Sequence, residues 1–458
     1  MNAAESQTAP AAETASARRA HPFLLPGLML GGALLGALLG GAFAGHWAEL
    51  KRWTASPEGA VGAPFAVVAI PGAFNLLGEI FMNLLKMLVI PLIVFSVMFA
   101  VAGLGDLRRM SRLFGYTIFY FLLTMTLAVI AGMTLVNVIQ PGKGASTELR
   151  DEASVQRAAK AKAEKAPPVT KVYDLVRGMF PANLFKAAAE MNVLGLIMFS
   201  LFFGAILGSM GERGARVTEL IGTLNEALMQ FIYLVIWFAP LGIMGLVAER
   251  IGLLGGFGAI GAELQRLAWY ALTVVLGLLI HGMITLPLLL YFIGRKNPWK
   301  YAVGMSEALL TAFTTASSAA TLPVTIRCME EKNGVSPKTV GFVVPLGATV
   351  NMNGTALYEA VAALFIAQAY GVELDFAHQL LILVSATLAA IGAAAIPEAG
   401  LITMILVLVA AGLPVEGVGL ILSIDWILDR CRTTVNVWDD AVAAGIVDRW
   451  ASTQEPQR

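Results

Sequence analysis

Charged residues are scarce in this sequence. Only 14% of its 458 residues are Asp, Glu, Lys or Arg, and 57% are hydrophobic. A soluble globular chain needs about 25% charged residues to cover its surface. The shortage excludes an ordinary soluble domain and indicates a polytopic helical membrane protein. The 31 basic and 31 acidic residues cancel, so the net charge gives no reason to expect nucleic acid as a partner.

Cysteine and histidine are also few. Cys328 and Cys431 lie far apart and lack metal-ligand spacing, so we expect two buried apolar thiols, with a disulfide as the alternative. None of the four histidines stands beside a nucleophile or a second histidine: His21, His46, His281 and His378. The sequence therefore gives no support for a cofactor, a metal centre or a catalytic triad, and we expect no enzyme.

Long apolar runs are abundant. A membrane-spanning helix needs about 20 apolar residues. Six runs meet or approach this length: Phe23–Ala44, Leu84–Leu104, Tyr116–Ile139, Asn192–Leu207, Phe231–Val247 and Ala268–Ile293. The first resembles a signal peptide but exceeds the usual apolar length of about 7–15 residues, so we interpret it as the first span, with cleavage as the alternative.

Basic residues predict the orientation of the chain. Arg18 and Arg19 precede the first run, and the cluster Arg108, Arg109 and Arg112 follows the second. An even number of crossings places both groups on one side, which the positive-inside rule identifies as the cytoplasm. We expect both termini to be cytoplasmic.

The chain divides by composition. Residues 1–20 form a polar tail that we expect to be disordered, residues 21–295 carry the first six spans, residues 296–449 form a core of different character, and 450–458 form a short tail. Residues 143–169 form a polar connection between spans.

After Lys296 the apolar segments are interrupted by small residues and proline, at Thr314–Pro323 and again at Ala389–Gly400. The halves on either side are too short to span alone, which predicts two re-entrant helical hairpins whose tips meet inside the membrane. Irregular backbone is tolerated there only where protein buries it or where it lines a cavity. Paired broken segments indicate a transporter binding site built from inverted repeats. A Ser/Ala loop facing water is the alternative.

A polar stripe crosses the last apolar segment. At about 100° per residue, five side chains fall within roughly 80° of arc and extend over about 22 Å of helix: Asp425, Asp429, Arg432, Asn436 and Asp440. Each charge at mid-membrane costs on the order of 2.5–3.5 kcal/mol. The stripe sums to −2, so a sodium ion, a proton or a substrate ammonium should complete it, although mutual pairing in a buried structural network is the alternative. The planar guanidinium of Arg432 suits a carboxylate, and Arg430 points to the opposite face.

A second polar interruption lies in Gly347–Ala360. Asn351, Asn353 and Gly354 weaken a helix, so we expect the helix to unwind here and expose carbonyl oxygens suited to Na⁺. Glu359 has no basic residue within four positions and is a proton-carrier candidate; a permanently protonated structural Glu is the alternative.

At these residues the sequence resembles the dicarboxylate/amino acid:cation symporter family, which includes the glutamate transporters. TTASSAATLPVT resembles its first hairpin tip and NMNGTALYEA its broken seventh helix. AAAIPEAGLITM resembles the second hairpin tip and DWILDRCRTTVNVWDDA the eighth helix. Weaker likeness extends the resemblance over about residues 23–449.

The resemblance implies an all-α fold of eight spans plus two re-entrant hairpins. It also implies a homotrimer in the lipid bilayer, an uncoupled anion conductance and an elevator movement. Helices 1, 2, 4 and 5 would form the trimerisation scaffold, and helices 3 and 6 would move with the 296–449 core. The implied function is symport of L-glutamate or L-aspartate with Na⁺ and/or H⁺.

Site residues follow from the matching positions. The resemblance implies that Arg432 holds the side-chain carboxylate of the substrate and Asp429 its ammonium. Further substrate contacts would come from Ser317, Ser318, Thr355, Ile396, Gly400, Thr433 and Asn436. One sodium site would use Gly347, Asn351, Asn436 and Asp440, and another would use Thr349, Met352 and the second hairpin. Glu359 matches the residue that the glutamate transporters use for proton coupling.

The sequence departs from the family at a third sodium site. The matching positions read Phe121, Thr124, Met125, Asn351 and Asn353, where the family has Tyr, Thr, Ser, Asn and Asp. Two hydroxyls and a carboxylate are missing, and the carboxylate is the formal charge that would offset a desolvated ion. We therefore expect this degraded site to bind no sodium. Ala395 and Glu398 also depart, at the second hairpin tip.

Other functions remain as alternatives. A C4-dicarboxylate carrier of this fold would lack the acid at Asp429, and a neutral amino-acid exchanger would lack Arg432. A channel or a membrane-embedded enzyme with paired aspartates would need neither closing hairpins nor the arginine. The modest length and the absence of a long external loop favour a bacterial inner membrane.

Overall fold

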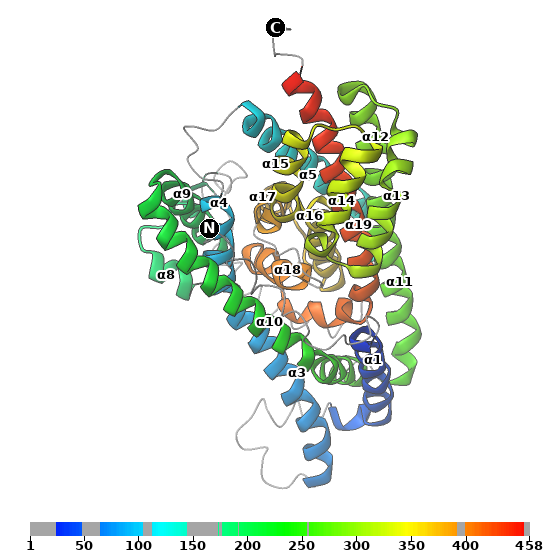
Figure 1. Cartoon of the computed structure of the whole chain (residues 1–458). Coiled ribbons are helices and arrows are strands. Elements are labelled where there is room, and N and C mark those ends of the chain that lie inside the picture. Colours follow the sequence, from blue (N-terminus) through cyan, green and yellow to red (C-terminus); the bar gives the residue numbers. More distant parts are fainter. Residues whose placement is uncertain are drawn as a thin grey trace, which may run out of the picture.

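The computed structural model describes residues 24–47, 65–103, 112–143, 173, 176–190, 192–253, 256–391 and 399–452. Helices account for nearly all of these residues, and no strand occurs among them (Figure 1). Arg18, Arg19, Arg108 and Arg109, on which the orientation depends, lie outside the described residues, as do 1–20 and most of 143–169.

The first part of the chain supplies long helices, some of which continue through a short π-helical turn. In chain order they are α1 (Leu24–Ala42), α3 (Phe65–Leu92), η3 (Ile93–Val97), α4 (Met98–Ala102), α5 (Arg112–Ile139), α8 (Leu184–Ala189), α9 (Val193–Ser209), α10 (Glu212–Leu253), α11 (Phe257–Ile280), η4 (His281–Thr285), α12 (Leu286–Leu289) and η5 (Leu290–Gly294).

The second part consists of shorter helices before one long final helix. They are α13 (Pro298–Thr315), α14 (Ser318–Arg327), η6 (Cys328–Lys332), α15 (Pro337–Val350), α16 (Asn353–Ala369), α17 (Phe376–Ile391), α18 (Ala399–Ala410), η7 (Val415–Gly417) and α19 (Val418–Ser452).

Two groups of helices pack together in Figure 1. In the first, α1 and α3 lie along α10, and α4 packs against α9. In the second, α16 lies among α5, α17, α18 and α19, while α13 and α15 also pack on α19. The 42-residue α10 is about 63 Å long at 1.5 Å per residue. It exceeds the roughly 30 Å hydrocarbon core, so its whole length cannot stand upright within that core.

The apolar runs seen in the sequence fall on helices. Four described helical segments are long and apolar enough to cross a membrane: Pro71–Ala102, Leu113–Ile139, Glu212–Leu253 and Ile260–Gly294. Shorter apolar helices occur at Gly27–Ala42, Val193–Ser209 and Phe376–Ile391. The first expected span and the fourth therefore form shorter apolar helices than the rest.

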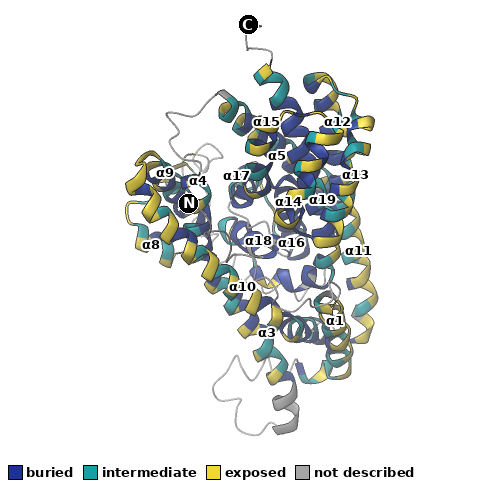
Figure 2. Cartoon of the chain, in the orientation of Figure 1, coloured by how far each residue is buried: buried dark blue, intermediate teal, exposed yellow. Residues whose placement is uncertain are grey.

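Burial concentrates on the second group of helices. Every residue of α16 is buried except Gln368, which is half-buried. Figure 2 shows buried residues around α16 and α18, with exposed ones on outer helices such as α8, α9 and α11. Many of the exposed side chains are large and apolar, such as Leu34, Phe203 and Phe292, which suits a surface that faces lipid.

Both predicted interruptions separate consecutive helices that pack on each other. α13 ends at Thr315, Ala316 adopts a left-handed conformation with φ 51°, and α14 begins at Ser318. α17 and α18 pair in the same way, but the connection 392–398 lies outside the described residues. Ala395, Ile396 and Glu398 belong to that connection.

Candidate functional site

The chain leaves the helical conformation between α15 and α16, as the sequence predicted. α15 ends at Val350, and Asn351 (φ −111°, ψ 71°) and Met352 (φ −103°, ψ 66°) leave the helical conformation before α16 begins. Both residues are buried. The break therefore brings non-helical backbone into the interior, opposite the polar stripe of α19.

Arg432 lies at the centre of the stripe and is fully buried. Its guanidinium contacts both oxygens of Asp425, with Nη1–Oδ1 at 3.0 Å and Nη2–Oδ2 at 3.3 Å, and Oδ1 of Asp429 at 2.7 Å. The ring of Tyr358 from α16 lies 3.9 Å from its Cζ atom. Buried charges are tolerated only with such pairing.

The five stripe residues are all buried, but the charged side chains among them are not independent of one another. Arg432 takes Asp425 and Asp429 as ion-pair partners, so this part of the stripe partly neutralises itself and retains one excess negative charge. Pairing within the stripe was the alternative in the sequence interpretation, and it describes this end. Arg430, which the sequence places on the opposite face, bonds outside the stripe. Its Nη1 donates to the carbonyls of Phe313 (3.0 Å) and Thr314 (2.6 Å) at the end of α13.

Asn436 joins α19 to the start of α16. Its Oδ1 accepts a hydrogen bond from the Gly354 amide at 2.7 Å, and its Nδ2 donates to Thr355 Oγ1 at 3.3 Å. Thr433 and Thr355 are buried, as are Ser317 and Ser318 at the start of α14, where Ser317 caps the helix by accepting from Ala320 N. The structure thus brings Thr355 and Asn436 together.

Gly400 at the start of α18 lies against the guanidinium. A Cβ atom at this position would stand 2.8 Å from Nη1 and 3.0 Å from Cζ of Arg432. The absence of a side chain therefore allows the α18 backbone to approach the arginine.

Asp440 lies against the broken helix. Asn351 Nδ2 donates to its Oδ1 at 3.0 Å, and a Cβ on Gly347 would overlap that oxygen. Thr349 is exposed on α15 and points away, with its hydroxyl bonded to Leu346 O. The described residues contain no group of three His, Cys, Asp or Glu that could hold a metal ion. Any ion here would depend on the Asp440 carboxylate together with amide, hydroxyl and backbone oxygens.

Asp439 was missed by the sequence interpretation. It is fully buried and accepts four hydrogen bonds: from Tyr120 Oη at 2.8 Å, Thr124 Oγ1 at 3.2 Å, Asn351 Nδ2 at 2.7 Å and Asn353 Nδ2 at 2.6 Å. Its only sequence signal is an acid beside Asp440 in a buried helix. It lies about 100° around the helix from Asp440 but only about 20° beyond Arg432, at the edge of the stripe.

Position 353 carries no acid, as the sequence shows, but the structure places the carboxylate of Asp439 beside Asn353. Thr124 and Asn353, assigned to that degraded site, both contact Asp439, and Tyr120 supplies a hydroxyl one residue before the missing one. Phe121 and Met125 are buried apolar residues, as their identities require. That this site binds no sodium stays a prediction, but it can no longer rest on the absence of a nearby carboxylate.

Glu359 is fully buried on α16. Its carboxylate oxygens accept no hydrogen bond of regular geometry from the described residues, and the Thr403 hydroxyl of α18 lies near them. No ion pair to this carboxyl group occurs among the described residues, so its burial is costly for the charged form.

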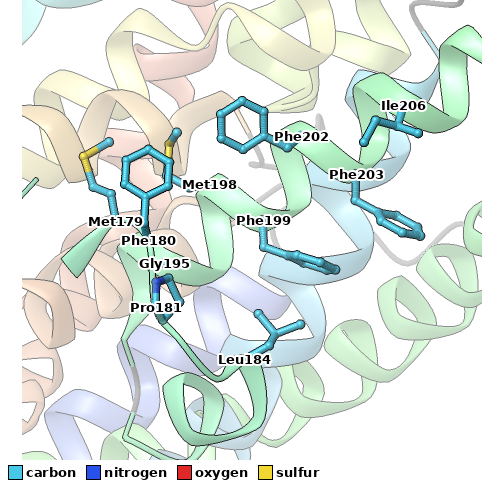
Figure 3. A pocket seen from close by; sticks show the side chains of 10 residues that line it. All are labelled: Met179, Phe180, Pro181, Leu184, Gly195, Met198, Phe199, Phe202, Phe203 and Ile206. Carbon is cyan, nitrogen blue, oxygen red and sulfur yellow. The ribbon is translucent and has the colours of Figure 1, made fainter. Parts of the chain in front are cut away.

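Two apolar pockets lie away from these polar groups. One of about 370 Å³ is formed by α8, α9 and the residues before them, and Figure 3 shows that the side chains lining it are apolar: Met179, Phe180, Pro181, Leu184, Met198, Phe199, Phe202, Phe203 and Ile206, with Gly195. Another of about 670 Å³ lies between α11, α13 and α19. Neither offers partners for a multiply charged solute.

Comparison with known proteins agrees with these features. Excitatory amino acid transporter 1 of Ambystoma tigrinum is 38% identical over 428 residues, covering 82% of this chain and 77% of that protein. Human excitatory amino acid transporter 5 is 38% identical over 436 residues, covering 82% and 76%. A Caenorhabditis elegans protein described as the putative sodium-dependent excitatory amino acid transporter glt-4 is 40% identical over 419 residues, covering 82% and 83%. Residues 26–450 match the model of the sodium:dicarboxylate symporter family, and the chain belongs to that family of membrane transporters.

Proposed function

We propose that this protein is a secondary active symporter that carries L-glutamate or L-aspartate across a membrane with Na⁺ and/or H⁺. The observation that carries the proposal is the fully buried Arg432 held by Asp425 and Asp429 on α19. An arginine fork binds a carboxylate, and an adjacent acid binds an ammonium. Family membership and the relatives named above support the same function.

Binding would proceed by exchange of partners at Arg432. The side-chain carboxylate of the substrate would replace acids of the chain on the guanidinium, which would release Asp429 for the substrate ammonium. Hydrogen bonds to the substrate would come from Thr355, Thr433 and Asn436. Asn436 Nδ2 and Thr355 Oγ1 already lie 3.3 Å apart. Ser317 and Ser318 at the start of α14, and the segment from Ile396 to Gly400, would close over the bound amino acid.

Two sodium sites belong to this proposal. One is formed by Asp440, Asn436 and the carbonyls of Gly347 and Asn351, and it is supported by the close packing of Gly347 against Asp440. The other uses carbonyls of Thr349 and Met352 with the second hairpin. Broken helices supply oxygen ligands of this kind for Na⁺ in transporters.

Glu359 is the proposed proton carrier. A buried carboxylic acid that lacks a basic partner binds and releases a proton only when its surroundings change. An elevator movement would supply that change by exposing the core to each side of the membrane in turn.

The proposed architecture has eight spans, two re-entrant hairpins and a homotrimeric assembly. Helices α13 with α14 and α17 with α18 would be the hairpins. The group around α10 would form the fixed scaffold, and the group around α16, including α5 and α11, would move. The apolar face of α9 shown in Figure 3 suits lipid or another copy of the chain.

The proposed location is a bacterial inner membrane with both termini in the cytoplasm. The relatives named above are animal proteins, so this part of the proposal rests on the sequence alone.

Reconstitution into liposomes tests the function. Labelled aspartate uptake should be concentrative when an inward Na⁺ gradient is imposed, and a separate H⁺ gradient should show the contribution of protons. Excess unlabelled glutamate should compete, whereas succinate and serine should compete weakly. Strong competition by succinate would indicate a C4-dicarboxylate carrier, and strong competition by serine a neutral amino-acid exchanger.

A further inference from the structure

We infer that Asp439 restores a cation-binding site for sodium among Tyr120, Thr124, Asn351 and Asn353, with its carboxylate supplied by α19 instead of α16. The inference rests on the proposed sodium-coupled function and extends it. It reverses the expectation drawn from the sequence, which assumed that no acid faces this place.

The five side chains form one enclosed cluster. Each is at most 1% exposed, and their polar groups converge on the two carboxylate oxygens of Asp439. Tyr120 contacts Oδ1, while Thr124, Asn351 and Asn353 contact Oδ2. Tyr120 and Thr124 lie on α5, Asn351 lies in the break after α15, Asn353 begins α16 and Asp439 lies on α19. The cluster therefore exists only in the folded core.

The amide groups carry a second, independent sign of a ligand. The Oδ1 atoms of Asn351 and Asn353 are buried and accept no hydrogen bond from the described residues. A half-turn of each terminal amide exchanges nitrogen and oxygen, two atoms that a structure distinguishes only through their hydrogen bonds. Both carbonyl oxygens would then face Asp439, an arrangement that a cation between them would stabilise, and Asn353 Oδ1 would stand where Nδ2 now lies 3.2 Å from Nε2 of His281.

The hydroxyls can also turn toward a cation. Thr124 Oγ1 lies 3.0 Å from Tyr120 O and 3.3 Å from Phe121 O, so its hydrogen can be donated to the α5 backbone instead of Asp439. Its lone pairs then point into the cluster. Together with Tyr120 Oη, the two amide oxygens and the carboxylate, the cluster offers five oxygen ligands, which is the ligand type that hard cations prefer.

The charge of the cluster calls for a monovalent ion. Asp439 has no basic residue within 4.0 Å among the described residues, and the same is true of Asp440. Two adjacent buried carboxylates without basic partners are costly. Asn351 Nδ2 donates to both, at 2.7 and 3.0 Å. One sodium ion at each acid would neutralise the pair, and Asn351 would link the two sites.

A fixed anion is the competing interpretation. Four donors can satisfy an ionised carboxylate without a metal, in which case Asp439 would only organise the broken helix. Sodium stoichiometry separates the two interpretations, because a structural anion adds no ion to the transport cycle.

The test measures ²²Na⁺ and labelled aspartate uptake by the same proteoliposomes. Asp439→Asn should lower the sodium-to-aspartate ratio by one ion. The double variant Asp439→Asn, Asn353→Asp returns a carboxylate to the same cluster from α16 and should restore the ratio. Asp448→Asn removes a carboxylate from the same helix, one bonded to Ser336 and Thr339, and should leave the ratio unchanged. An unchanged ratio in Asp439→Asn, or a folded double variant that fails to restore it, would overturn the inference.

A binding measurement keeps the test independent of transport. Sodium chloride without substrate should raise the melting temperature of the purified protein relative to choline chloride, because an ion that binds only the folded state stabilises it. Thr124→Val keeps the carboxylate, so it serves even if Asp439→Asn does not fold. Thr124→Val should raise the sodium concentration that gives half-maximal stabilisation about fivefold, because one oxygen ligand is lost. No change in Thr124→Val would contradict the site. If sodium stabilises the wild-type protein and Thr124→Val weakens that stabilisation, but no sodium-driven uptake occurs, the proposed function fails while the site survives.

Discussion

Gly347→Ala should damage the Asp440 sodium site with little effect on the fold. A Cβ on Gly347 would overlap Oδ1 of Asp440 and stand 2.6 Å from its Cγ. That separation is far below an ordinary carbon–carbon contact of about 3.5–4.0 Å, so the carboxylate must rotate or shift by roughly 1 Å. The movement would weaken its 3.0 Å hydrogen bond with Asn351 Nδ2 and displace the proposed sodium ligands.

The expected loss of sodium affinity is roughly 10- to 100-fold, the range found when groups that orient metal ligands are disturbed. The assay is aspartate uptake as a function of external sodium, with the half-saturating concentration as the readout. Gly341→Ala is the matched control, because a Cβ there on the same α15 helix meets nothing within 4 Å. A half-saturating sodium concentration that stays equal in Gly347→Ala and wild type would refute this account of the Asp440 site.

Three further substitutions test other contacts. Arg432→Cys should weaken aspartate binding by roughly 100-fold or more through loss of the charged hydrogen bonds; unchanged competition by acidic amino acids would contradict the substrate assignment. Glu359→Gln should remove stimulation of uptake by an acidic exterior but keep sodium dependence, and persistent stimulation would exclude Glu359 as the carrier. Arg430→Ala should lower the free energy of unfolding by about 1–3 kcal/mol, because the last carbonyls of α13 lose their hydrogen-bond donor. An unaltered melting temperature would show that this contact does not stabilise the protein.

Local patterns in the sequence predicted much of the core. Gly354 and the asparagines on either side of Met352 disfavour a helix whatever surrounds them, so the break between α15 and α16 could be located from residue types alone. The stripe on α19 could be located because a helix has a fixed angle per residue. Both predictions depend on properties of one segment.

Contacts between distant segments could not be predicted in this way. Asp439 lies at the edge of the stripe, about 20° beyond Arg432. Its role depends on Tyr120, 319 positions earlier, which only the packing of α5 against α19 brings close. The matching positions show that the acid is missing at 353, but they carry no information about an acid that another helix supplies. The pairing of Arg432 with Asp425 could not be predicted either, because spacing shows which residues share a helix face but not which of them form hydrogen bonds.

The short contact between Asn353 and Asp439 limits how such transporters can diverge. Asn353 Nδ2 lies 2.6 Å from Oδ2 of Asp439, so an aspartate at 353 would bring two like charges together unless position 439 lost its acid. A member of the family can therefore carry the acid on α16 or on α19, whereas acids at both positions would repel each other. Members of the family should fall into two classes that differ jointly at these positions, and a chain with neither acid should work with one fewer ion per cycle.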